Sequence, residues 1–152
     1  MIPEELWARA AFDRLDETGR RGFEEAAELR RFSAEEVIYE AGGDSKGMYI
    51  LASGQISLFD RVMATLSGDA EVIIDQRGAL VSRGSLLDAF QHRHDCVART
   101  DCELLFLSRE AFETAFEANE PFALRLVDYL VQRGSDDVRA FNQAIHGTLS
   151  QS

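Results

Sequence analysis

With 152 residues, 45% of them hydrophobic and 28% charged, the chain has the length and composition of one soluble globular domain with a buried core. Its 27 acidic residues outnumber its 16 basic residues, and the resulting net charge of −11 disfavours direct binding to the phosphate backbone of nucleic acids. No apolar run approaches the roughly 18 residues of a membrane-spanning helix, and the N-terminus lacks the segments of a secretion signal, so we expect a cytoplasmic protein without membrane contact.

The first segment, residues 4–29, has a helical pattern. Alanine, glutamate and leucine recur at helical spacing over residues 4–11 and 22–29. We expect short helices that cover the rest of the domain.

Residues 30–107 consist of short strand-like runs separated by glycine turns at intervals of about 8–12 residues, which is typical of an antiparallel sandwich or barrel. Gly42 or Gly43, and Gly54, occupy tight turns that need a positive φ. The predicted strands are 36–40, 48–52, 55–59, 71–75, 78–81, 96–98 and 104–107. This segment is therefore predicted to form a small antiparallel β-roll or jelly-roll barrel.

The only two cysteines, Cys96 and Cys102, lie in apolar strand-like contexts. Their spacing matches no metal-binding pattern, so we expect free buried thiols of a reducing compartment rather than a disulfide.

Residues 109–147 return to a helical pattern. Ser108 is a suitable N-cap for a helix over 109–118, with Glu110 in its first turn, and Pro121 stands at the first position of a second, long helix. An apolar seam continues beyond Gly134, farther than a small barrel would cover, and predicts a homodimer through the C-terminal helix. The prediction is thus an α+β, mainly β, fold in a single domain, residues 1–152.

Three groups of residues follow one another in a recognisable order. They are Phe32, Val37, Ile38, Glu40, Gly42, Asp44, Met48, Tyr49, Ile50, Leu51, Gly54 and Ile56; then Cys102, Glu103, Leu104, Leu105, Leu107 and Phe112; then Asn119, Pro121, Arg125 and Leu126. The pattern resembles the cyclic nucleotide-binding domain of bacterial catabolite-activator-type regulators, kinase regulatory subunits and gated channels, and it extends to about Phe141.

The resemblance implies a phosphate-binding cassette of the form Gly-Glu-(Leu/Ile)-Ala, several residues, then Arg-(Ala/Ser/Thr)-Ala. In it the arginine and backbone N–H groups bind the cyclic phosphate, and the glutamate accepts from the ribose hydroxyl. Here Gly84-Ser85-Leu86-Leu87 matches the start, but Asp88 and Ala89 follow where the family has glycine and glutamate, and the arginine position falls on His92, with Arg93 one place later.

These departures predict a degenerate cassette. Only Phe90 and Gln91 separate its two halves, so we expect the short helix of the cassette to be lost, and Asp88 and Asp95 add negative charge. Missing bonds of this kind weaken binding by about two to three orders of magnitude. We therefore expect weak or lost binding of cyclic AMP and cyclic GMP.

The function we favour from the sequence is a stand-alone regulatory or ligand-sensing module that acts through an unknown protein partner, because few residues follow Phe141 and leave no room for an output domain. Its pocket would take another small-molecule ligand or none, and no cofactor is expected. The alternative within the same fold is a genuine cyclic nucleotide receptor that acts through a partner.

A second alternative is a cupin-like metal site at His92-x-His94, with Glu103 downstream. In a cupin the glutamate should follow after three or four residues, where this chain has Cys96, Val97 and Ala98, so His92 and His94 are only weak metal candidates and no metal is expected. No catalytic motif such as Gly-x-Ser-x-Gly or His-Glu-x-x-His is present, and we expect no enzyme.

Overall fold

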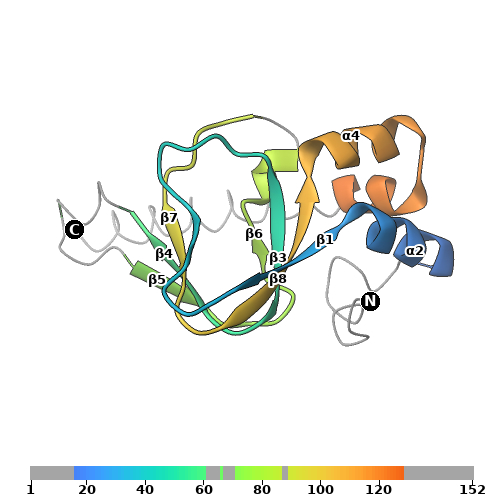
Figure 1. Cartoon of the computed structure of the whole chain (residues 1–152). Coiled ribbons are helices and arrows are strands. Elements are labelled where there is room, and N and C mark those ends of the chain that lie inside the picture. Colours follow the sequence, from blue (N-terminus) through green and yellow to red (C-terminus); the bar gives the residue numbers. More distant parts are fainter. Residues whose placement is uncertain (1–15, 61–65, 67–70, 87–88, 129–152) are drawn as a thin grey trace, which may run out of the picture.

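Two antiparallel sheets face each other in the computed structural model, which describes residues 16–60, 66, 71–86 and 89–128 (Figure 1). In spatial order, the first sheet contains β1 (Glu28–Phe32), β8 (Cys102–Ser108), β3 (Gly47–Ser53) and β6 (Leu80–Val81). The second contains β2 (Val37–Tyr39), β7 (Asp95–Ala98), β4 (Ile56–Phe59) and β5 (Glu71–Ile74). The predicted mainly-β roll is confirmed, but its two sheets remain separate and do not close into a barrel.

The predicted helix over 22–29 is wrong at both ends. Helix α2 (Glu17–Ala26) begins earlier, because the Asp16 side chain caps it by accepting a hydrogen bond of 2.7 Å from the backbone N–H of Gly19. Leu29 belongs instead to β1, where it lies opposite Leu105 of β8. Alanine, glutamate and leucine favour a helix locally, but pairing along the full length of β1 overrides that preference.

The C-terminal part follows the prediction as far as it is described. Helix α4 (Arg109–Glu117) is capped by Ser108, whose hydroxyl oxygen accepts from the backbone N–H of Ala111 at 3.0 Å. A further helix begins at Pro121 and is described to residue 128. The predicted helix over 4–11 and the dimerisation segment beyond Gly134 lie outside the described residues.

Two apolar clusters hold the fold together. The outer face of the first sheet packs against the helices, where Phe23 of α2 meets Phe122 edge-to-face with ring centroids 5.9 Å apart. Between the sheets lie Leu51, Ile56 and the buried free thiols of Cys96 and Cys102, and the expectation of free cysteines is confirmed. The helices and strands thus form separate ends of the domain, and β3 and β8 contribute residues to both clusters (Figure 1).

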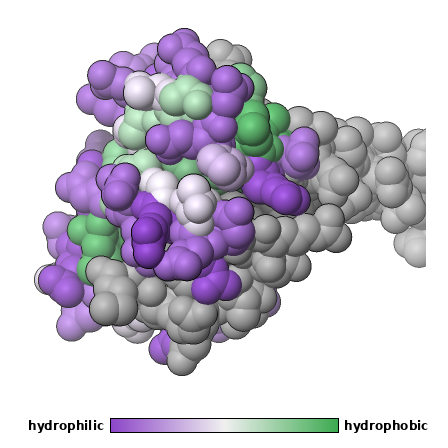
Figure 2. Space-filling view, turned by 90° about the vertical axis from the view of Figure 1, so that its right-hand side faces the viewer, coloured by the Kyte–Doolittle hydropathy of each residue, from purple (hydrophilic) through white to green (hydrophobic). Residues whose placement is uncertain are grey.

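The surface at the helical end is mostly hydrophilic, with smaller hydrophobic areas between the polar side chains (Figure 2). This agrees with a net charge of −11. None of the helices in the described part of the chain has both the length and the apolar character needed to cross a membrane.

Candidate ligand-binding site

The segment between β6 and β7 begins with a tight turn. Strand β6 ends at Val81, Ser82 adopts a φ of 58°, and a 3₁₀ helix, η1 (Arg83–Leu86), follows directly. The hydroxyl oxygens of Ser82 and Ser85 are 2.5 Å apart, and Ser85 is fully buried. This single turn overlaps the start of the predicted cassette. The predicted loss of a helix concerns the residues that follow, of which Leu87 and Asp88 lie outside the described residues.

The predicted residues Gly84 and Leu86 both lie in this turn, whereas Leu87 and Asp88 fall outside the described residues. Leu86 is 2% exposed and packs in the apolar cluster beneath the helices. Its side chain is therefore part of the core and is not presented to a ligand.

Arg109, the first residue of α4, anchors the turn. Its Nη1 atom donates to the backbone carbonyl of Ser85 at 3.0 Å and to that of Ser45 at 3.1 Å. Because Ser45 lies in the loop between β2 and β3, one guanidinium group joins that loop to η1. Charge-assisted bonds of this kind are stronger than neutral ones, so the two segments should move together.

The second half of the cassette pairs with the same loop. The backbone N–H of His92 donates to the carbonyl of Gly43, and that of Gly42 donates to the carbonyl of His92, both at 2.8 Å. The N–H of Ser45 donates to the carbonyl of Phe90 at 2.7 Å. Ala89, the predicted substitute for the ribose-binding glutamate, precedes this paired stretch and is exposed.

His92, which the sequence analysis assigned to the arginine position of the cassette, is 8% exposed. Its ring stacks on Tyr39 with centroids 3.8 Å apart and planes inclined by 16°, and Phe90 meets it edge-on at 5.8 Å. Burial lowers the pKa of His92 below its ordinary value, which disfavours the charged imidazolium.

Arg93 is engaged elsewhere. Its Nε atom donates to Oδ2 of Asp60 at 2.9 Å, and the same oxygen lies 3.7 Å from Nε2 of His94. The Asp60 side chain is only 7% exposed and is therefore a buried carboxylate beside the cassette. The sequence analysis did not identify it. Asp95, which was expected to repel a phosphate, accepts from the backbone N–H of Ala41 at 2.8 Å and so supports the loop.

The two weak metal candidates have different surroundings. His92 stacks within the roll, whereas His94 lies beside Asp60. In the part of the chain that the structure describes, no three histidine, cysteine, aspartate or glutamate side chains are grouped so that they could hold a metal ion.

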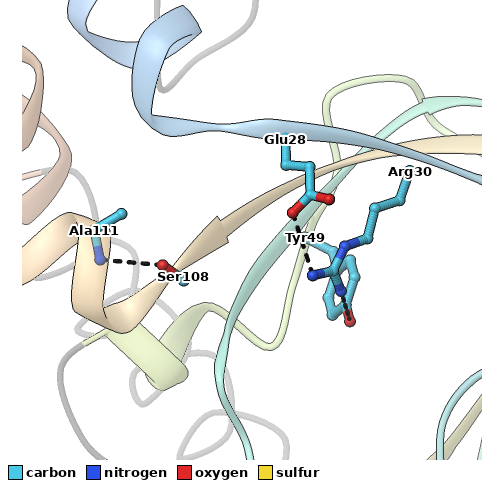
Figure 3. A network of polar contacts seen from close by, with 5 residues as sticks. All are labelled: Glu28, Arg30, Tyr49, Ser108 and Ala111. Carbon is cyan, nitrogen blue, oxygen red and sulfur yellow. Dashed lines mark hydrogen bonds and ion pairs between the residues drawn. The ribbon is translucent and has the colours of Figure 1, made fainter.

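A cleft of about 670 Å³ opens beside β1 and β2, the adjoining edges of the two sheets. The residues that line it include Arg30, Tyr39, Tyr49, His92 and Phe106. Arg30 extends from β1 toward the Tyr49 hydroxyl (Figure 3). The sequence analysis missed this cleft because it placed the first two residues of β1, Glu28 and Leu29, in a helix and predicted no strand before residue 36. In the structure Arg30 and Phe32 are half-buried, whereas Arg31 between them is exposed.

Two facing antiparallel sheets, helices packed at one end and a short helical turn between β6 and β7 define a ligand-sensing β-roll module. Residues 29–119 match the family described as the cyclic nucleotide-binding domain, and the chain belongs to that family. The resemblance read from the sequence is thereby confirmed. The family is one of regulatory binding domains and not of enzymes.

Solved structures are similar in fold. The N-terminal domain of a transcriptional regulator from Streptomyces coelicolor A3(2) has a TM-score of 0.71 and 17% identity, covering 92% of this chain and 94% of that chain. A cyclic nucleotide-binding domain from Methylobacillus flagellatus KT has a TM-score of 0.74 and 14% identity, covering 91% and 77%. The catabolite activator protein of Thermus thermophilus has a TM-score of 0.68 and 22% identity, covering 88% of this chain and 62% of that one. No curated protein matches the sequence.

Proposed function

We propose that this chain is a regulatory, ligand-sensing module whose binding of cyclic AMP and cyclic GMP is weakened or lost. The observation that carries the proposal is the burial of His92 and its stacking on Tyr39, because the sequence comparison assigns His92 to the arginine position of the cassette. An uncharged ring there supplies no charge-assisted bond to a cyclic phosphate, and binding an anion inside a protein without such a partner is costly.

The missing ribose acceptor supports the same conclusion. The sequence comparison assigns Ala89 to the position of the ribose-binding glutamate. The alanine side chain has no carboxylate that could accept a hydrogen bond from the ribose hydroxyl.

Arg93 is a poor substitute for the missing arginine. Its Nε atom is bound to Asp60. A phosphate would have to compete with this buried carboxylate for the Arg93 guanidinium and would also be repelled by its negative charge. Together with the missing glutamate, we expect a loss of about two to three orders of magnitude in affinity.

Titration calorimetry with cyclic AMP, cyclic GMP and cyclic di-GMP tests the proposal. We expect no binding tighter than about 10 μM, which corresponds to roughly −7 kcal/mol. Tighter binding would establish the alternative, a genuine cyclic nucleotide receptor. Should that occur, Arg93→Ala should abolish the binding if Arg93 holds the phosphate. The matched control is Arg99→Ala, which removes a cation that pairs with Glu71 of β5.

We further propose that the module acts in the cytoplasm through a protein partner, with a second copy of the chain as the first candidate. Phe116 of α4 and Leu124 of the following helix, 43% and 42% exposed, support this by leaving apolar surface at the helical end. Light scattering at micromolar concentration measures the mass. A mass of one chain would exclude the homodimer and leave a different protein as the partner.

A further inference from the structure

We propose that the cleft beside β1 and β2, which shares only His92 with the predicted cassette residues, is a second binding site that takes a small aromatic carboxylate. The cleft opens where the β1 edge of the first sheet and the β2 edge of the second adjoin, whereas η1 follows β6 at the other edge of the first sheet. A ligand in the cleft would therefore not need any of the cassette's missing groups.

The size and lining of the cleft suit a flat apolar body. Its volume of about 670 Å³ lies within the range of roughly 300–1,000 Å³ that is usual for small-molecule sites. One wall is the stacked pair of Tyr39 and His92, and another is Tyr49 with Phe106, whose ring centroids are 4.9 Å apart. Aromatic rings bind a further ring by offset or edge-to-face contact.

Arg30 supplies a cation at the aromatic wall. Its guanidinium carbon lies 3.8 Å from the centre of the Phe106 ring, and its polar contacts, with the Tyr49 hydroxyl and with Oε2 of Glu28, are both 3.4 Å long (Figure 3). These contacts are near the outer limit for a hydrogen bond. A guanidinium has five N–H donors in a planar fork, so Arg30 keeps the capacity to bind a carboxylate bidentately.

The charges around the cleft select a monoanion. Lys46 also lines the cleft, and its side chain has no hydrogen bond or ion pair with another described residue. Arg109, the third lining cation, holds the carbonyls of Ser45 and Ser85. Three carboxylates also line the cleft: Asp44, Glu110 and Glu113. They would repel a phosphate ester of charge −2 more strongly than a carboxylate of charge −1. The aromatic walls, one accessible guanidinium and this acidic rim together favour an aromatic carboxylate over a nucleotide.

Chemical-shift titration of the isotope-labelled full chain tests the site with 4-hydroxybenzoate, indole-3-acetate and 2-naphthoate. Each probe is paired with its uncharged carboxamide, and inorganic phosphate and cyclic AMP are titrated in parallel. We expect at least one carboxylate to shift the resonances of Arg30, Tyr49 and His92 at millimolar concentration, and to bind about tenfold or more tightly than its carboxamide.

Variants of two neighbouring arginines sharpen the test. Arg30→Gln should remove the preference for the carboxylate, whereas Arg31→Gln, which removes the same charge from the next residue of β1, should leave it unchanged. Arg31 points away from the cleft, is 76% exposed and pairs with Glu103.

Three results would overturn the inference: no shift with any carboxylate at about 5 mM, equal binding of acid and amide, or an equal effect of the two substitutions. Because the proposed function concerns cyclic AMP and cyclic GMP, tight cyclic AMP binding would overturn that function and leave the aromatic carboxylate site standing.

Discussion

Two turn glycines with the same backbone angle but different surroundings allow a sharp test of the fold. Gly42 has a φ of 89° and Gly54 a φ of 90°, and both confirm the predicted tight turns. A side chain on Gly42 would meet no atom within 4 Å. A Cβ on Gly54 would lie 2.5 Å from the carbonyl oxygen of Asp101 and 2.5 Å from the Cβ of Cys102.

The two alanine substitutions should therefore differ in cost. In Gly42→Ala only the left-handed backbone is unfavourable, by about 1–2 kcal/mol, and the stiffer unfolded chain offsets about 0.4–1 kcal/mol of this. Gly54→Ala has the same terms plus an overlap with backbone atoms that cannot rotate away, which adds about 1–3 kcal/mol. We expect net losses of about 1 kcal/mol for Gly42→Ala and about 2–4 kcal/mol for Gly54→Ala.

Urea unfolding followed by circular dichroism measures both free energies. A difference of 2 kcal/mol corresponds to about 4–8 °C in Tm for a chain of this length, and thermal unfolding provides an independent reading. If the two variants lost the same stability, the close approach of the β3–β4 turn to Asp101 and Cys102 would not be a constraint on the fold, and the reasoning would fail.

Two further predictions concern titratable groups between the sheets. Burial raises the pKa of Cys96 to about 12 and also raises the pKa of Cys102, so both thiols should stay protonated at pH 8. We expect them to react with a thiol reagent at least about 100-fold more slowly in the native protein than in urea. Rapid labelling of the native protein would contradict this. Burial lowers the pKa of His92, so on acidification the unfolded chain takes up a proton first, below about pH 6.5, and the free energy of unfolding should decline from that pH downward. The glutamine of His92→Gln cannot titrate, so the free energy of unfolding of this variant should decline less on acidification than that of the unmodified chain. Urea unfolding at pH 5.5–7.5 measures both, and an unchanged pH dependence in the variant would refute the role of His92.

The strands were predictable because their signals are local. Alternating apolar residues and glycine turns located every strand from β2 to β8 to within a few residues, and the Ser108 cap was found from its residue type and position. The cap of α2 at Asp16 and the start of β1 were missed. A composition rich in Ala, Glu and Leu favours a helix locally, and only the pairing of β1 with β8 makes these residues a strand.

The candidate site was predictable only as a position in the chain. The sequence comparison predicted His92 at the arginine position, but its stacking on Tyr39 depends on a pairing between the cassette and the β2–β3 loop. The bond from Arg93 to Asp60 and the contact of Arg30 with Phe106 likewise join elements that are distant along the chain. Such contacts leave no periodic signal in the sequence, because each depends on one pair of residues.

By itself, the sequence determined the class of fold, the family and the substitutions in the cassette, since hydrophobic alternation, turn glycines and residue identities are properties of short segments. The tertiary structure alone decided which charges are available. It buried His92 against Tyr39, bound Arg93 to a buried carboxylate, and left Arg30 beside an aromatic wall, where its two polar contacts with described residues are both 3.4 Å long. The physical reason is that burial and pairing, which decide whether a charged group is available to a ligand, arise only when distant segments pack together.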